Sequence, residues 1–299
     1  MLVLLYYYYT DIKDLDTIFE EHKNFCNKYD FKGRIIIANE GLNGTISGSN
    51  EACNKYMNFL KSYNIFCDIK FKIDSCNNHL FPKLSIKKRN EIVSLYRTDL
   101  KPHKKTGIRL SPEEFYNVMS DDLEDAIILD VRSKYEHNLG KFKNAKILNL
   151  NNFRDLSAEL ENITNDKNKK ILTYCTGGIK CEKASALLLE EGFKNVYQLN
   201  GGIINYGKEM NGIDFEGKCY VFDSRLAVDV NKINPKNITK CFICKVESDR
   251  ITNCIYTKCN LQTIICLDCN NKLKGCCSEE CKNQPNNLKY IPFCQKTQI

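Results

Sequence analysis

Cys175 stands where a strand pattern gives way to a glycine-rich turn and then to a helix pattern. The apolar residues 171–174 precede it, Gly177 and Gly178 follow, and helical periodicity begins at about Lys180. The backbone N–H groups of such a turn, together with the positive end of the helix dipole, favour an anion. A thiolate is an anion, so we expect a depressed pKa and a nucleophilic sulfur at Cys175. The alternative is a buried structural cysteine at a strand end.

Other residues around this cysteine would support the same chemistry. Lys180 places a cation at the end of the loop. Asp130 and Arg132 follow a buried strand and are expected to buttress the loop. Cys181 lies across the loop and could resolve a persulfide or sulfenic acid into a disulfide, or serve only as a small helix residue. The predicted anion cradle comprises Thr176, Gly177, Gly178, Ile179 and Lys180.

The second concentration of reactive side chains lies near the C-terminus. Ten of the 17 cysteines fall between positions 241 and 294, a region without histidine. Two C-x-x-C pairs fit a tetrahedral structural zinc site with four thiolate ligands. These ligands are Cys241, Cys244, Cys266 and Cys269. A second site is open to Cys254, Cys259, Cys276 or Cys277, and Cys281. Free thiols and reversible disulfides are the alternatives.

Positive charge is concentrated in one stretch of the chain. Residues 83–109 contain nine Lys and Arg against two acids, so this stretch alone accounts for the net charge of +7. It is a candidate contact for a phosphate backbone, although a solvated lysine-rich linker has the same composition. The predicted RNA-binding residues are Lys87, Lys88, Arg89, Arg97, Lys104, Lys105 and Arg109.

The positions of the apolar residues predict a multidomain α/β and α+β protein. Residues 1–95 have the β-α-β-β-α-β order of a ferredoxin-like (acylphosphatase-like) domain. Its strands are expected at 2–8, 34–38, 44–47 and 68–73, and its helices at 12–29 and 49–63. Between the second and third strands, the backbone amides around Gly41–Gly44 form either a phosphate contact or a plain strand connection.

The rest of the chain divides into three further segments. A basic connector (96–120) precedes a parallel α/β domain (121–217), with strands expected at 126–132, 145–150, 171–174 and 196–199. A cysteine-rich tail (218–299) has few aliphatic residues, so it needs metal ions or covalent cross-links to hold one conformation. The apolar residues 2–9 predict a strand, not a signal peptide, and no run would span a membrane, so we expect a cytoplasmic protein.

The 121–217 segment resembles a rhodanese domain. The marks are Asp130-Val131-Arg132 after a strand, Cys175 and Lys180 in a C-x-x-x-x-K loop, and Asn200-Gly201-Gly202 after the last strand. The resemblance implies a cysteine that carries sulfur as a persulfide. Many members of that family have arginine at the position of Lys180. Lysine keeps the positive charge but cannot donate two parallel hydrogen bonds to one anion, as a guanidinium group can.

The chain as a whole resembles the bacterial tRNA uridine hydroxylases of the TrhO type, which have a central rhodanese domain. Residues 40–48, 175–185, 217–225 and 276–281 carry this resemblance in family order. It implies hydroxylation at C5 of the wobble uridine of tRNA, giving 5-hydroxyuridine, with molecular oxygen as co-substrate. The partner would be the tRNA anticodon region, with the base flipped toward Cys175.

Two other function classes stay open at this point. A sulfurtransferase would pass a Cys175 persulfide to a small thiophile or a protein, and a non-enzymatic zinc-stabilised binding module would carry a vestigial loop. The sequence contains no flavin, haem or nucleotide motif and no iron-binding histidine set. It does not identify the electron or sulfur donor.

Overall fold

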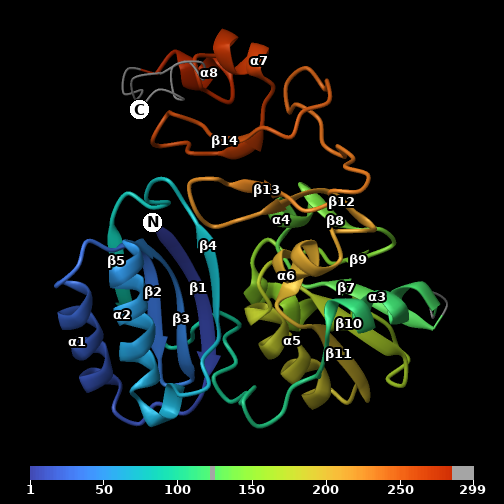
Figure 1. The fold of residues 1–299 in the computed structure, drawn as a ribbon. Helices are drawn as coiled ribbons and strands as arrows, with labels where there is room; N and C mark the ends of the chain where they lie inside the picture. Colours follow the sequence, from blue (N-terminus) through green and yellow to red (C-terminus); the bar gives the residue numbers. More distant parts are fainter. Residues whose placement is uncertain (122–124, 285–299) are drawn as a thin grey trace.

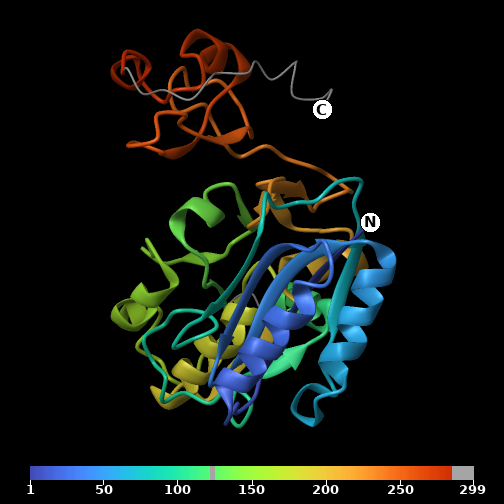
Figure 2. The same ribbon diagram turned by 90° about the vertical axis from the view of Figure 1, so that its left-hand side faces the viewer.

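The computed structural model describes residues 1–121 and 125–284. Three parts follow one another along the chain: an N-terminal domain in blue, a central domain in green and yellow, and a cysteine-rich tail in orange and red (Figure 1). The first two lie side by side, and the tail lies beyond one end of both (Figure 2). Among the described residues, no helix is long and apolar enough to cross a membrane.

The N-terminal domain has the predicted β-α-β-β-α-β order. Its elements are β1 (Leu2–Tyr9), α1 (Leu15–Cys26), β2 (Lys32–Ala38), β3 (Gly41–Gly48), α2 (Asn50–Lys61), the 3-10 turn η1 (Asn64–Phe66) and β4 (Phe71–Ser75). A further strand, β5 (Leu84–Lys88), pairs parallel with β2. The sheet order is β4-β1-β3-β2-β5, and the four predicted strands pair antiparallel.

Alternation along each strand gives this sheet two different faces. Leu4 and Tyr6 of β1 pack with Ile18 of α1 and Tyr56 of α2 in one core. Residues at the intervening positions, such as Leu5, face the other way, because successive strand side chains point to opposite faces. The two helices cover only the first face, and the second face is turned toward the central domain (Figure 1).

The strand β3 begins at Gly41, earlier than the expected residue 44. Asn43 pairs with Tyr7 of β1 on one side and Ile36 of β2 on the other. The backbone around Gly41 and Gly44 is therefore part of the sheet ladder. The Gly-Leu-Asn-Gly motif thus lies inside a strand and not in the connection expected between two strands, and its backbone pairs with the neighbouring strands instead of forming an exposed turn for a phosphate.

The central domain is built on a parallel sheet with strand order β6-β11-β10-β7-β9. The strands are β6 (Ile108–Leu110), β7 (Ala126–Asp130), β9 (Lys146–Ile147), β10 (Lys170–Tyr174) and β11 (Asn195–Leu199). The helices are α3 (Pro112–Asp121), α4 (Lys134–His137), α5 (Ile179–Glu190) and α6 (Gly202–Glu209), with the 3-10 helix η2 (Phe153–Asn162). The strand expected at 145–150 forms a ladder over only two residues.

A small antiparallel sheet connects the central domain to the tail. It contains β8 (Gly140–Phe142), β12 (Phe215–Tyr220) and β13 (Ala227–Asp229). Up to residue 284, where the description of the tail ends, its elements are β14 (Ile251–Asn253), β15 (Gln262–Ile264), α7 (Leu267–Lys272) and α8 (Glu279–Lys282). Within these residues, its buried cluster contains four cysteines and two aliphatic residues, Ile265 and Leu273.

A buried ion cluster ties the first two domains together. Lys183 of α5 is fully buried, and its Nζ lies 2.7 Å from Glu40 Oε2 and 2.5 Å from Glu91 Oε1. Glu40 belongs to the turn between β2 and β3, and Glu91 follows β5. Glu91 also accepts hydrogen bonds from the backbone N–H groups of residues 95–97. Burial raises the pKa of Glu40 despite its contact with Lys183.

Replacing Lys183 with methionine should destabilise the protein strongly. The change keeps the length of the side chain but leaves two buried carboxylates without their shared cation, which costs about 3–5 kcal/mol. Urea unfolding followed by tyrosine fluorescence measures the difference in free energy of unfolding. The exposed Lys194 supplies the control, Lys194→Met. Equal stability of the two variants would contradict the structural role of the cluster.

Candidate active site

Cys175 lies between the end of β10 and the start of α5, as the sequence predicts. Its Sγ accepts a hydrogen bond from the Gly178 N–H at 3.1 Å. Gly178 has a φ of +99°, a left-handed conformation that suits glycine. The loop rests on Gly202, where an added Cβ would lie 2.5 Å from the Cys175 carbonyl oxygen. The Gly-Gly turn after β11 thus lets the Cys175 loop pack against the start of α6.

The surroundings of Cys175 favour its thiolate. Burial opposes ionisation, but a hydrogen bond from the Cys181 thiol, the charge of Lys180 and the N–H groups of Cys181 and Gly178 outweigh it. Together they lower the pKa of Cys175 to about 6. Burial and the neighbouring Cys175 raise the pKa of Cys181, so Cys181 stays the thiol donor of the pair. At neutral pH the sulfur at position 175 is therefore ionised.

Asp130 and Arg132 hold the strand β10, which ends directly before Cys175. The Tyr174 hydroxyl donates to Asp130 Oδ2 at 2.7 Å, and Arg132 donates to both carboxylate oxygens of Asp130. Arg132 also donates to the Gly140 carbonyl at 2.7 Å. Asp130, Arg132 and Tyr174 are all fully buried. Because Tyr174 directly precedes Cys175, this network fixes the position at which the loop begins.

Lys180 is not a free cation at the end of the loop. Its Nζ lies 2.5 Å from Glu136 Oε2, and that carboxylate is fully buried. The ammonium still lowers the pKa of Cys175 through space. Glu136 thus orients Lys180 and offsets part of its charge.

Sequence reasoning missed Lys72, which enters the site from β4 of the N-terminal domain. Its Nζ donates to the carbonyl oxygens of Gly177 at 2.5 Å and Gly201 at 2.7 Å. These two glycines belong to the two turns that pack together at the site. Burial lowers the pKa of Lys72 to about 8, although the nearby Cys175 and Cys181 act in the opposite direction. Nothing in the local sequence marks this lysine, because only the packing of the two domains brings it to Cys175.

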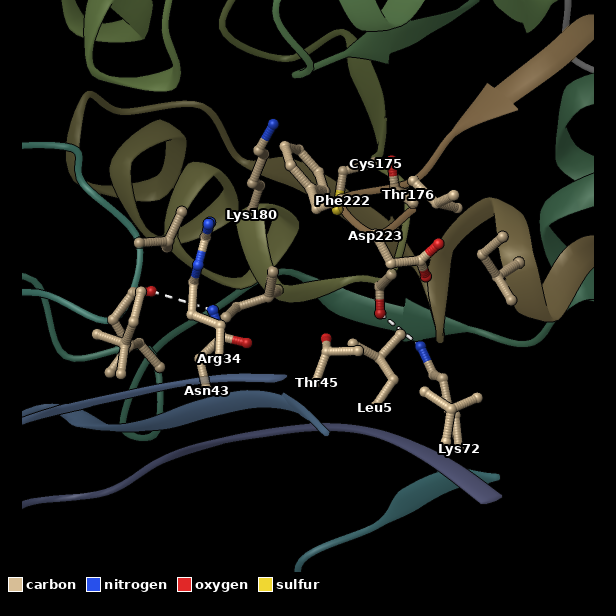
Figure 3. Close-up of a pocket in the computed structure, with 18 of the residues that line it drawn as sticks. Leu5, Arg34, Asn43, Thr45, Lys72, Cys175, Thr176, Lys180, Phe222 and Asp223 are labelled. Atoms are coloured by element: carbon tan, nitrogen blue, oxygen red, sulfur yellow. Dashed lines mark hydrogen bonds between the residues drawn. The ribbon is translucent and has the colours of Figure 1, made fainter. Parts of the chain in front are cut away.

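The sulfur of Cys175 faces a cavity of about 380 Å³ between the two domains. Leu5, Arg34, Asn43 and Thr45 rise into it from the helix-free face of the N-terminal sheet (Figure 3). Cys175, Thr176 and Lys180 line the opposite side, with Phe222 and Asp223 from the segment after β12. Arg89 and Arg225 also line the cavity. The cavity combines apolar walls with several cations and amide or hydroxyl groups.

Three family models match successive parts of the chain. They are the UPF0176 acylphosphatase-like domain over residues 1–92, the rhodanese-like domain over 111–209 and the rhodanese C-terminal region over 216–282. A tRNA uridine(34) hydroxylase of Cytophaga hutchinsonii is 50% identical over 96% of this chain and 92% of its own length.

Two further relatives carry the same name. The Listeria welshimeri protein is 43% identical over 96% of this chain and 90% of its own. The Onion yellows phytoplasma protein is 44% identical over 97% of this chain and 94% of its own length. The chain belongs to the tRNA uridine(34) hydroxylase family. The resemblance predicted from the four sequence passages is thereby confirmed, as are the acylphosphatase-like and rhodanese-like folds.

In this family member, the predicted RNA-binding cations are not equally available. Lys88, Arg97, Lys104 and Arg109 lie near the carboxylates of Asp16, Asp99, Asp11 and Glu182 respectively. The pair between Arg109 and Glu182 is bidentate, with both distances at 2.8 Å. Arg89 lines the cavity, and Lys87 and Lys105 are exposed. Binding of RNA by these seven residues stays a prediction.

The tail of the protein brings the predicted cysteine ligands together. The sulfur atoms of Cys241, Cys244, Cys266 and Cys269 lie within 4.8 Å of one another. Four sulfurs at this separation are a suitable donor set for a metal ion.

Proposed function

We propose that this protein hydroxylates C5 of the wobble uridine in tRNA, with molecular oxygen as co-substrate. The observation that carries the proposal is its similarity, over nearly the whole chain, to proteins named tRNA uridine(34) hydroxylase. The geometry supports it independently, because an ionised cysteine faces a cavity large enough for a nucleobase.

The cavity suits a flipped pyrimidine base. An enzyme that acts on a base within a folded RNA takes that base out of its stack and reads its edge by hydrogen bonds. Asn43, Thr45 and Arg34 provide donors and acceptors on the sheet side, and Phe222 provides an aromatic surface. The reacting carbon would then meet the Cys175 side of the cavity.

Cys175 is the proposed catalytic nucleophile. Two routes use its thiolate: addition to C6 of the uracil ring, which makes C5 electron-rich, or prior oxidation of the sulfur followed by oxygen transfer. In both routes the net reaction converts C–H to C–OH and reduces the second oxygen atom of O₂ to water. This balance requires two electrons and two protons from a reductant.

The other predicted site residues take supporting roles in this proposal. Thr176, Gly177, Gly178, Ile179 and Lys180 form the loop that stabilises negative charge, and Asp130 and Arg132 position the strand before it. Cys181 donates the hydrogen bond that helps to keep Cys175 ionised, and we propose it as the disulfide partner of an oxidised Cys175.

The remaining parts of the protein are assigned to binding and stability. Lys87, Arg89 and Lys105 are proposed to contact the anticodon arm. We assign a structural zinc ion to Cys241, Cys244, Cys266 and Cys269. Because tRNA is the proposed substrate, we place the protein in the cytoplasm.

The proposal is tested by nucleoside analysis of tRNA from cells with and without the gene, grown under ¹⁸O₂. We expect 5-hydroxyuridine to carry the heavy oxygen and to disappear when the gene is deleted. The proposal would be contradicted if the amount of 5-hydroxyuridine in tRNA stayed the same after deletion, in cells that have no other known pathway to this nucleoside.

A sulfurtransferase is the second candidate, because the thiolate and amide loop of Cys175 equally suit a persulfide. Incubation of the purified protein with thiosulfate distinguishes the two activities. A stable gain of one sulfur at Cys175, together with normal 5-hydroxyuridine in the deletion strain, would favour sulfur transfer.

A further inference from the structure

A second group of four cysteines lies beside the first in the tail. It consists of Cys254, Cys259, Cys277 and Cys281, whose sulfur atoms also lie within 4.8 Å of one another. The sequence left Cys276 and Cys277 as equal candidates for this group. The structure places Cys277 in it and leaves the buried neighbour Cys276 outside.

The two groups alternate along the chain. The first and third cysteine pairs (Cys241 with Cys244, Cys266 with Cys269) form one group, and the second and fourth pairs form the other. Each segment between successive pairs therefore runs from one group to the other. The hairpin of β14 and β15 lies within this arrangement, between Cys244 and Cys266.

The sulfur separations fit metal thiolates and not disulfides. Cys244 Sγ lies 3.6 Å from Cys266 Sγ, and Cys277 Sγ lies 3.6 Å from Cys259 Sγ and 3.7 Å from Cys281 Sγ. A disulfide needs about 2.0 Å. With a zinc–sulfur distance of about 2.3 Å, tetrahedral coordination places sulfurs about 3.8 Å apart.

Backbone N–H groups already point at the sulfurs in both groups. The Cys269 N–H donates to Cys266 Sγ, and the Cys277 N–H donates to Cys254 Sγ, each at 3.4 Å. Such bonds stabilise negative charge on sulfur and orient the ligands of a metal. Four thiolates brought this close would repel one another without a cation between them.

The apolar core of the tail is too small to explain its fold. Ile265 and Leu273 are the only aliphatic members of its buried cluster in the described part of the chain, and the other four members are cysteines. Segments with so little apolar surface depend on metals or cross-links. The metals would therefore supply the free energy of folding here.

We propose that the tail is a cross-braced module that holds two zinc ions, one in each cysteine group. Each Zn²⁺ binds four thiols as thiolates and releases four protons, with no change in oxidation state. All four positions of each ion are filled by protein sulfur, so both sites are structural. Since every connecting segment joins the two sites, loss of one ion weakens binding of the other.

The module also stabilises one wall of the cavity at the active site. Lys218 of β12 pairs with Asp249 of the tail at 3.0 Å, and the Gly217 N–H donates to the Lys236 carbonyl at 2.8 Å. The segment after β12 supplies Phe222, Asp223 and Arg225 to the cavity. Loss of zinc is therefore expected to loosen this wall as well as the tail.

Native mass spectrometry of the full-length protein, purified without added chelator, counts the bound ions. We expect two zinc ions per chain. The Cys277→Ala variant should retain at most one, and it should release that ion to a chelator at least about 10-fold faster than the unaltered protein. The matched control is Cys276→Ala, an adjacent buried cysteine outside both groups, which should keep both ions.

Cobalt substitution of the unaltered protein provides a test that does not depend on the folding of a variant. Two Co²⁺ ions with the absorption of tetrahedral four-sulfur sites would support the module. One ion per chain, disulfides detected as a loss of two hydrogens per cysteine pair, or iron in place of zinc would overturn it. The module would also be overturned if the Cys276→Ala variant lost an ion while the Cys277→Ala variant retained both.

Discussion

The Cys175→Ser variant is expected to make no detectable 5-hydroxyuridine, with activity reduced by at least about 10³-fold. The loop lowers the pKa of the thiol to about 6, so the native side chain is ionised at neutral pH. A serine hydroxyl in the same place stays protonated and is a far weaker nucleophile. Nucleoside analysis of tRNA from a deletion strain that expresses the variant measures the effect.

Cys26 supplies the matched control for this variant. It is equally buried, but it packs in the helix-covered core of the N-terminal domain. Cys26→Ala should retain activity within a few-fold of the unaltered protein. Normal 5-hydroxyuridine from folded Cys175→Ser protein would show that the sulfur takes no part in the reaction.

The Lys72→Met variant is expected to lose about 10²-fold in activity, because small displacements of reacting groups have effects of that size. Lys72 bridges the carbonyl oxygens of Gly177 and Gly201, and methionine of similar length cannot donate to either. The change also removes a cation near the thiolate, so the pKa of Cys175 should rise. The same nucleoside assay measures activity, and site-resolved alkylation measures the pKa.

The control for this variant is Lys70→Met, which removes an exposed lysine two residues away. It should change neither activity nor alkylation. If the Lys72→Met variant lost activity only because the whole protein is less stable, the pKa of Cys175 in the variant would stay near 6. The midpoint of its unfolding transition would fall at the same time. That result would contradict a role for Lys72 in positioning the loop.

The fold was predictable where local pattern determines structure. Alternation in β1 is a local signal, and so are the helix caps Asp14 and Ser49, whose side chains accept hydrogen bonds from the N–H groups of Thr17 and Ala52. The strand, cysteine, glycine turn and helix around Cys175 are equally local. By contrast, β5 alternates Leu84 and Ile86 with polar residues, but no strand was expected there, because its lysines belong to the basic stretch 83–109 that was interpreted as a phosphate contact or a solvated linker.

The features that were not predicted depend on contacts between distant segments. Lys72 lies 105 residues before Gly177, and Lys183 lies 143 residues after Glu40. Neither lysine differs in its sequence surroundings from the many exposed lysines of this chain. The choice between Cys276 and Cys277 likewise depends on which sulfur lies near Cys254, Cys259 and Cys281 at once, and cysteine spacing does not contain that information.

The most direct test of the account is the pH dependence of alkylation at Cys175 in the purified protein, followed by mass spectrometry of the peptide that contains it. Because the pKa is lowered, the thiolate should persist above about pH 6, and the rate should fall as the pH drops through that value. The account predicts a midpoint near 6. A midpoint near 8.5, which is typical of an unperturbed cysteine, would contradict it.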